Sequence, residues 1–561
     1  MFRLRPCLFA LAFLLPLTIS AQQGTFDPHP VFDGGGMRLH LSMRGQIAHN
    51  EVSIINGLLW PGDGASHGRL RGMCHSSTPV MLGTVNGERR VSASYYRDNF
   101  IPGPIIGGKP AVDPTDPFFR AYTVTWQETE TEDYREWPVN LGAPVQENGE
   151  PFFYGRKQMF WVMNDLDAAS MMENNGSLPL GLEMRCLLYE PWPAQARENT
   201  LLLQVTYINK GNEHITDAYA GYFMDADVRD DFMNLAGSDS LRNMVYTRDY
   251  NTLRDETGMP AALGLLMLQT PVVEAEGERA RWFAGWKEDA VNIPVSAAVL
   301  PIKWRPTAIS EPQLGDYIAQ WDALVQGQGA HGVHVINPHT GVPSRFWLSG
   351  DPVRGTGWLP EHGLPLSNGE NVNQGPADTR VLISAGPFSL APGDTQQVTY
   401  AFIATQGATP EAALHELQDR AEYMQAWFAE RPPATAYRSA VVRPANSNTA
   451  PGQIDVTARF GDVPVDCSVE VSDATGNVLI TASLDRFSVE SEWVYRTTVT
   501  LPQPHRQGVN ISFISEWNGE EVRIPGRVSF PVGGSVDFDG IVMLEEGDDN
   551  GRVAPDENAK W

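Results

Sequence analysis

The stretch Thr200-Leu-Leu-Leu-Gln-Val-Thr-Tyr-Ile208, followed by the segment Asn209–Asn212 and then by His214–Met224, decides the fold class of this chain. β-Branched and aromatic residues dominate both arms, as is typical of strands. Asn and Gly between the arms favour the positive φ angles with which a chain reverses. The segment therefore predicts a β-hairpin in a mainly β protein.

Short strands separated by turn residues continue in both directions, from Phe26 to Gln406. Within this region, Thr379–Phe388 and Gln397–Thr405 predict a second hairpin, because Pro and Gly lie between them. We expect residues 22–430 to form a large β-rich domain of β-sandwich type, with one or two subdomains.

One helix is expected to close this domain, over residues 409–430. Thr409 is a good N-cap, Pro410 suits the first helical position, and Glu411 complements the helix dipole. The Pro pair after Arg431 ends the helix. Apolar residues at helical spacing predict a face that packs on the sheets, namely Ala413, Leu414, Leu417, Ala421, Met424, Trp427 and Phe428.

The remaining residues divide into a linker, a second domain and a tail. Residues 431–452 are rich in Pro, Ala, Ser, Thr and Asn, which is typical of a linker. Residues 453–532 contain closely spaced short strands, which predict an immunoglobulin-like β-sandwich without the cysteine pair of antibody domains. Residues 533–561 form an acidic tail.

Residues 1–21 have the layout of a cleavable signal peptide. Arg3 and Arg5 precede an apolar core over Leu8–Leu17, and Ser20-Ala21 offers a cleavage point. The apolar core is shorter than the roughly 20 residues that a membrane span requires, which argues against a retained anchor. We therefore expect a secreted, extracellular or cell-surface protein with no membrane span after signal cleavage.

Charge and cysteine content exclude two classes of protein, namely those that bind nucleic acids and those built on a zinc or disulfide framework. The formal net charge of −27 repels phosphate backbones, so a nucleic-acid partner is not expected. Cys74, Cys186 and Cys467 remain after signal cleavage, too few for a zinc framework or a disulfide scaffold. Cys74 and Cys186 can pair as a disulfide or stay buried as free thiols.

The densest acidic cluster directly follows the second arm of the first predicted hairpin. Carboxylates spaced two and three residues apart in one loop can converge on Ca²⁺, which prefers such oxygen ligands. The alternative is a solvated acidic loop in an already acidic protein. The candidate ligands of this first site are Asp225, Asp227, Asp230, Asp231 and Asp239.

A second candidate calcium site lies in the tail. Counted from Ser535, the residues follow the order of an EF-hand loop, with Asp537 at the third position, Asp539 at the fifth and Glu546 at the twelfth. Pro and Gly on both sides argue against the flanking helices of a full EF-hand. A plain acidic tail is the alternative.

Several motifs occur in a characteristic order, and they comprise Val85–Arg89, Phe100–Ile105, Gln158–Asp165, Pro179–Glu183, Ala220–Asp239, Gly350–Pro352, Gly355–Trp358 and Ser384–Phe388 with Gly393-Asp394. Over about residues 30–430, the chain resembles an uncharacterised family of large secreted bacterial proteins that usually end in a type IX secretion sorting domain. The resemblance implies no catalytic residue, but it includes the first acidic cluster. No sorting domain is recognised in residues 444–561.

Together these patterns favour a non-enzymatic protein with a structural, adhesive or glycan-binding role. Ca²⁺ is expected to stabilise the 225–239 loop, and surface glycans or other envelope proteins are the expected partners. The 15 Trp and 16 Tyr residues offer stacking faces for sugars. The sequence lacks motifs such as HExxH, G-x-S-x-G and the P-loop. The alternative is a carbohydrate-active hydrolase or lyase with catalytic carboxylates on separate strands.

Overall fold

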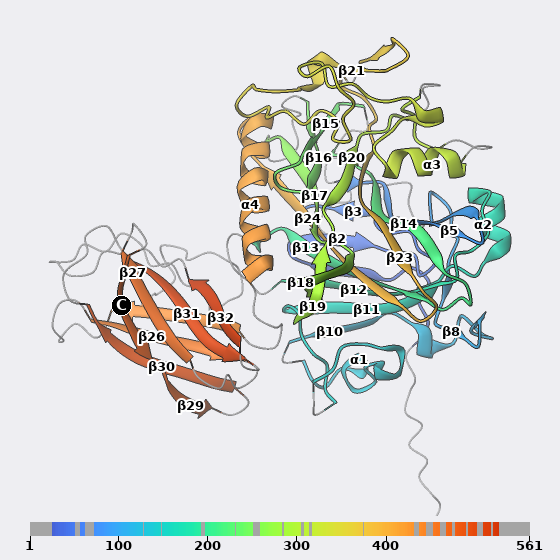
Figure 1. Cartoon of the computed structure of the whole chain (residues 1–561). Helices are drawn as coiled ribbons and strands as arrows, with labels where there is room; N and C mark the ends of the chain where they lie inside the picture. The colour runs from blue at the N-terminus through green and yellow to red at the C-terminus, as the bar shows by residue number, and fades with distance from the viewer. Residues whose placement is uncertain are drawn as a thin grey trace, which may run out of the picture.

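Figure 1 shows the chain in a computed structural model that is mainly β, as predicted. A large region of stacked sheets ends in helix α4 (Pro410–Glu430), and a smaller β-region follows. The predicted signal peptide and acidic tail lie outside the described residues. The structure describes residues 25–50, 56–61, 72–126, 128–146, 149–191, 197–229, 232–250, 259–282, 285–303, 308–312, 317–373, 375–430, 437–444, 453–460, 467–473, 477–489, 492–501, 509–517 and 520–526.

The larger region is built on two antiparallel sheets. The nine-stranded sheet has the order β10 (Tyr122–Thr125), β11 (Lys157–Asn164), β12 (Leu182–Glu190), β13 (Thr200–Asn209), β24 (Thr395–Gln406), β17 (Ala261–Gln269), β16 (Met244–Asp249) and β15 (Asn234–Asp239), with β7 (Ile101–Pro102) also paired to β11. The five-stranded sheet has the order β20 (Val295–Val299), β23 (Val381–Leu390), β14 (Ile215–Asp225), β5 (Ser76–Val85) and β6 (Glu88–Ala93).

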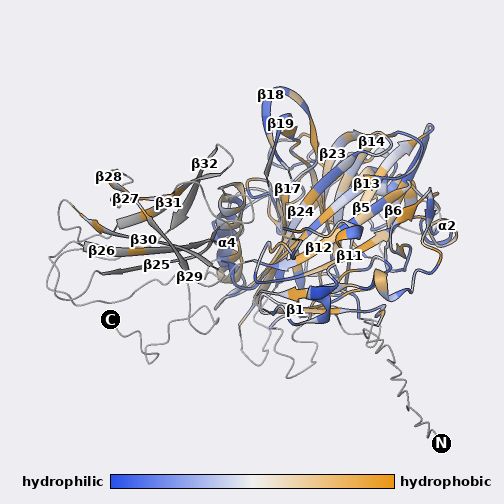
Figure 2. Cartoon of the chain, turned by 90° about the horizontal axis from the view of Figure 1, so that it is seen from below, coloured by the Kyte–Doolittle hydropathy of each residue, from blue (hydrophilic) through white to orange (hydrophobic). Residues whose placement is uncertain are grey.

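The two sheets pack face to face around the main hydrophobic core. The Tyr222 ring on β14 lies 4.9 Å from the Tyr400 ring on β24 and 5.4 Å from the Phe402 ring. Alternate residues of β13, from Leu201 to Tyr207, are buried in the same core. In Figure 2, apolar residues recur along the stacked strands, as two inward-facing sheet surfaces require.

Both predicted hairpins are wrong in their pairing, although their strands are present. β13 and β14 belong to different sheets, as do β23 and β24, so each turn carries the chain across the core. β13 instead pairs with β24, and β14 with β23. The two turns meet where the Asn209 N–H donates to the Asp394 carbonyl at 3.0 Å. Local turn chemistry is the same in both arrangements, but only the observed one lets the apolar arms face each other across the core.

Helices cover the outer faces of both sheets (Figure 1). α4 packs on β16, β17 and β24 through Leu414, Leu417 and Met424, which are fully buried, and the Ala412 N–H donates to Thr409 Oγ1 at 3.1 Å. α3 (Tyr317–Val325) packs on the five-stranded sheet, where the Trp321 ring lies 5.5 Å from the Phe223 ring. The larger region therefore has four layers, two sheets between two helices.

Among the described residues, no helix combines the length and apolar composition that crossing a membrane requires.

Shorter elements surround the four layers. The shorter elements are β1 (Val31–Gly34), β2 (Met37–His40), β3 (Leu58–Leu59), β4 (Gly72–Cys74), β8 (Ile105–Ile106), β9 (Lys109–Pro110), α1 (Glu132–Arg135), α2 (Ala168–Asn175), β18 (Val272–Trp282), β19 (Gly285–Asn292), β21 (Leu364–Pro365) and β22 (Asn371–Val372).

The smaller region consists of two four-stranded antiparallel sheets. Counted along the chain, the strands of one sheet lie in the order first, second, sixth and fifth. Those of the other sheet lie in the order fourth, third, seventh and eighth, and together these are the orders of an immunoglobulin-like sandwich. The range predicted as a linker, 431–452, contains the first of these strands, which pairs with the next strand in an antiparallel ladder with one register shift near its start. The strands are β25 (Tyr437–Pro444), β26 (Gln453–Phe460), β27 (Cys467–Asp473), β28 (Val478–Ser483), β29 (Asp485–Val489), β30 (Glu492–Thr500), β31 (Val509–Trp517) and β32 (Glu520–Gly526).

Cys74, Cys186 and Cys467 are buried free thiols, so the Cys74–Cys186 disulfide considered from the sequence is not formed. The Cys74 thiol donates to the Ser76 carbonyl at 3.4 Å. Burial raises the pKa of the Cys186 thiol, which therefore stays protonated at neutral pH. The large region is thus stabilised by its cores rather than by a cross-link between these cysteines.

The packing of α4 on the sheet predicts the cost of a core truncation. Leu417 is fully buried above Gly264 of β17, so Leu417→Ala should lower the free energy of unfolding by about 2–5 kcal/mol. His415 lies on the exposed side of the same helix, and His415→Ala should change it by less than about 0.5 kcal/mol. Urea unfolding of both variants measures the difference, and equal effects would contradict the packing.

Asp165 follows β11 and is completely buried. Its carboxylate accepts the N–H groups of Leu180 and Leu182, both at 2.8 Å, and of Gly181 at 3.1 Å. Burial raises the pKa of Asp165 from the ordinary 3.8 to about 6, and the backbone N–H donors oppose this rise. The folded state therefore favours the protonated form more than the unfolded state does.

This shift predicts a dependence of stability on pH. The contribution of Asp165 is fully present below pH 3.8 and is lost as the pH rises through about 6, a loss of about 3 kcal/mol. Asp165→Asn removes this titration, so the variant should gain stability relative to the natural chain between pH 4 and 6. Urea unfolding across that range measures it, and a constant difference between the two chains would contradict it.

Candidate metal centre

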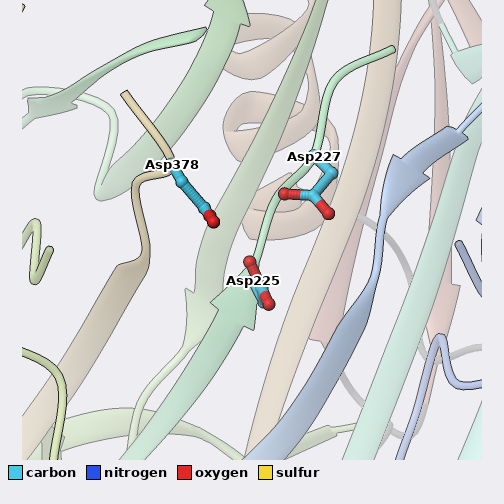
Figure 3. Close-up of side chains that lie close together, drawn as sticks. All are labelled: Asp225, Asp227 and Asp378. Atoms are coloured by element: carbon cyan, nitrogen blue, oxygen red, sulfur yellow. The ribbon is translucent and has the colours of Figure 1, made fainter. Parts of the chain in front are cut away.

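Three carboxylates gather at one end of the five-stranded sheet (Figure 3). One oxygen from each of Asp225, Asp227 and Asp378 lies within 4.8 Å of the others. Two oxygens that bind one Ca²⁺ at about 2.3–2.6 Å each can be at most about 5 Å apart. The cluster therefore has the spacing of ligands that share one cation.

The pairing of β14 with β23 explains why residues far apart in the sequence meet here. Met224 lies opposite Val381 in the ladder. Asp225, the last residue of β14, is therefore next to the segment that leads into β23 and carries Asp378 and Arg380. Because β14 and β23 are neighbours in the five-stranded sheet, Asp225 and Asp378 lie close together.

Neighbouring segments fix the backbone around the two acids from β14. Asp225 lies opposite Ser76 of β5, and its carbonyl accepts the His75 N–H at 2.9 Å. Asp227 follows in the loop after β14, where its carbonyl accepts the Asn56 side-chain N–H at 3.0 Å. Hydrogen bonds therefore hold both positions before any ion binds.

Arg380 is fully buried and ties the acids together. Its Nη1 lies 2.7 Å from Asp225 Oδ1 and also contacts Asp378 Oδ1, and its Nε donates to Glu311 Oε2 at 3.0 Å. Lys303 Nζ lies 2.8 Å from the second oxygen of Asp378. Because a buried guanidinium is costly unless it is neutralised, Arg380 and these carboxylates require one another.

Tyr96 covers Asp225 from a second direction. Its hydroxyl donates to Asp225 Oδ2 at 2.6 Å and lies 3.4 Å from Glu311 Oε2, and its ring centre lies 5.9 Å from the Arg380 guanidinium. The backbone of Tyr96 has a φ of 52°, in the left-handed region that aromatic residues seldom occupy. Such strain persists only where the surroundings enforce it, which indicates that this hydroxyl is held in place.

Burial decides the protonation of the groups at this site. Burial raises the pKa of Asp225, and Arg380 and Tyr96 oppose this rise. Burial, followed by the charge of Asp225, raises the pKa of the Cys74 thiol, which is therefore no nucleophile. Burial lowers the pKa of His75, whose imidazole is neutral at pH 7.

The cluster and its neighbours are rich in carboxylate oxygens. Asp225, Asp227, Asp378 and Glu311 supply four carboxylates beside Arg380 and Lys303. An all-oxygen ligand set suits Ca²⁺ or Mg²⁺ rather than Zn²⁺, and the larger Ca²⁺ accepts irregular geometry.

The structure brings together part of the predicted ligand set. Asp225 and Asp227 of the first site lie in the cluster. Asp239 does not, because it caps the turn after β15 and lies 2.9 Å from Arg242 Nη1. The other predicted ligands lie outside the described residues, namely Asp230, Asp231, Asp537, Asp539 and Glu546.

The sequence interpretation missed Asp378, Arg380, Glu311, Lys303 and Tyr96. They come from three segments that lie far apart in the sequence, namely the loop after β6, the segment between β20 and α3, and the segment before β23. The one available signal was the alternation Asp378-Thr-Arg380 just before an apolar strand, since such residues lie on one side of the extended backbone. Using that signal required the pairing of β14 with β23, which the predicted hairpins did not provide.

Comparisons with known proteins do not identify the chain. No family model and no curated protein matches it. Among solved structures, it is similar to a protein titled a polysaccharide lyase, with 10% identity and a TM-score of 0.24, over 89% of this chain and 46% of that one. It is also similar to a truncated ectodomain of the C. elegans fusion protein EFF-1, with 8% identity and a TM-score of 0.11, over 89% of this chain and 97% of that one. The chain spans less than half of the lyase, and scores this low carry no argument.

The Arg380 contacts predict a large effect of its removal. Arg380→Met leaves three buried carboxylates without their shared partner and should lower the free energy of unfolding at pH 7 by about 3–5 kcal/mol. Arg354 is 81% exposed and pairs with Asp351, so Arg354→Met should cost less than about 1 kcal/mol. Urea unfolding in chelator compares the two variants, and similar values would refute the role assigned to Arg380.

Proposed function

We propose that this chain is a secreted or cell-surface protein with a structural, adhesive or glycan-binding role, whose large sandwich is stabilised by Ca²⁺. Asp225, Asp227 and Asp378 would hold the ion, while Arg380 and Lys303 balance part of the charge. The proposed location is supported by the signal-peptide pattern of residues 1–21. Surface glycans or other envelope proteins are the proposed partners.

The observation that carries a structural role is the burial of the gathered acids. Asp225 is 1% exposed, Glu311 3% and Asp378 6%, and each contacts Arg380. Together with Tyr96 they connect β14, the segment before β23, the loop after β6 and the segment before α3. A cation at this point would add a further connection between the same segments.

The same burial argues against these acids as the catalytic pair of a glycoside hydrolase. Such a pair needs one carboxyl group that protonates the substrate and a second that attacks or activates water, both facing the sugar. Asp225 and Asp378 instead direct their oxygens to Arg380, Lys303 and Tyr96. The arrangement is therefore not that of a catalytic acid pair.

Calcium binding predicts a chelator-sensitive melt. Calcium should raise the melting temperature of the natural chain, and chelator should lower it, because an ion that binds only the folded state stabilises it by mass action. An excess of 100 times the dissociation constant corresponds to about 2.7 kcal/mol. Differential scanning fluorimetry over a wide calcium range measures the shift, and an unchanged melt would remove calcium from the proposal.

Matched variants test which carboxylates cause the calcium-dependent shift of the melting temperature. Asp225→Asn combined with Asp227→Asn should abolish the calcium response while leaving a cooperative melt in chelator. Asp239→Asn is the control, because Asp239 belongs to the same acidic stretch but pairs with Arg242 outside the cluster. Loss of the response in the control alone would place the ion elsewhere.

A further inference from the structure

A hollow of about 360 Å³ lies beside β10, at the edge of the nine-stranded sheet. Its walls come from β10, helix α1, and two short 3-10 helices at Pro117–Phe119 and Val139–Leu141. In Figure 1, α1 marks its position. None of its lining residues belongs to the metal cluster, and its volume is at the small end of ligand pockets, about 300–1,000 Å³.

The hollow has a rigid aromatic floor and an apolar rim. Trp137 and Tyr122 are 6% and 1% exposed, and Trp137 Nε1 donates to the Pro144 carbonyl at 2.8 Å. Phe118 and Val139 on the rim are 40% and 45% exposed. The rim therefore offers apolar surface to a ligand, and the floor beneath it is fixed.

The polar wall is organised by a guanidinium that the protein itself saturates. Arg120 lies 4.0 Å over the Tyr122 ring, donates to Asp133 Oδ1 at 3.1 Å and to Glu136 Oε2 at 2.9 Å, and also reaches the Pro117 carbonyl at 3.1 Å. Its Nε and both terminal nitrogens are therefore engaged. Glu136, whose side chain is 34% exposed, is held at a fixed orientation on the wall.

The charges around the hollow do not favour an anionic ligand. Arg120 and Arg135 are outnumbered by Asp133, Glu136 and Glu130, which lies 3.5 Å from Arg135. The net local charge is negative, as is that of the whole chain at −27. A carboxylated or sulfated ligand would meet repulsion here, whereas a neutral ligand would not.

We propose that this hollow binds a short segment of a neutral saccharide. The C–H face of a sugar ring matches the rim formed by Phe118 and Val139, and its hydroxyl groups match the carboxylate of Glu136 and the side chains of Asn140 and Arg135. The pre-set orientation of Glu136 reduces the ordering that binding requires. This inference rests on the glycan-binding part of the proposed function and names its site and ligand class.

Biolayer interferometry on the full chain tests the site. The probes are immobilised neutral oligosaccharides of glucose, xylose and mannose, with polygalacturonate and heparin as anionic probes. Phe118→Ala should weaken binding to the recognised neutral probe by about tenfold, because it removes the apolar ring surface of the rim. Val139→Glu, which blocks the exposed rim, should weaken it at least as much. Leu241→Ala and Val342→Glu change exposed apolar residues outside the hollow and should have no effect.

The outcomes separate this site from the wider proposal. Neutral binding that both rim variants weaken, with a calcium-dependent melt unchanged in those variants, supports the hollow as the site. Neutral binding that survives both variants overturns this site and leaves glycan binding standing. Binding only to the anionic probes, or to no probe, overturns the site; the chelator melt tests the calcium proposal separately.

Discussion

The larger region depends on carboxylates that balance the positive charge of a fully buried arginine. Arg380 has no exposed surface, and the burial of its guanidinium is tolerated because carboxylates from three separate segments surround it. Two of those acids, Asp225 and Asp378, lie at the facing ends of β14 and β23. The sheet register, the loop that carries Glu311 and the left-handed backbone of Tyr96 are therefore all constrained by one charge.

The same contacts shape the proposed cation site. Asp225 and Asp378, which contact Arg380, lie with Asp227 in a cluster no wider than a calcium coordination shell. In this proposal, ion binding and sheet packing are parts of one arrangement. The hollow beside β10 is built from other segments, so the proposed stabilising centre and the proposed recognition site are separate.

The sequence was informative where a signal is local. Strand composition predicted the mainly β fold, the cap and apolar stripe predicted α4, and close acidic spacing identified Asp225 and Asp227. The sequence interpretation was wrong where the residues that contact each other lie far apart in the chain. The turn at Asn209–Asn212 has the same chemistry whether its arms pair directly or face each other across a core, so the pairing of β14 with β23 was missed. Asp378 and Arg380 were missed with it, because that pairing brings their segment next to Asp225.

The central claim is that Asp225, Asp227 and Asp378 share a cation. Crystals of the full chain grown with calcium and then exchanged into manganese allow a direct measurement, since manganese accepts similar oxygen ligands and scatters anomalously. The account predicts one anomalous peak within about 2.6 Å of an oxygen from each of the three carboxylates. A well-ordered site with no peak, and with Arg380 alone bridging the acids, would contradict it.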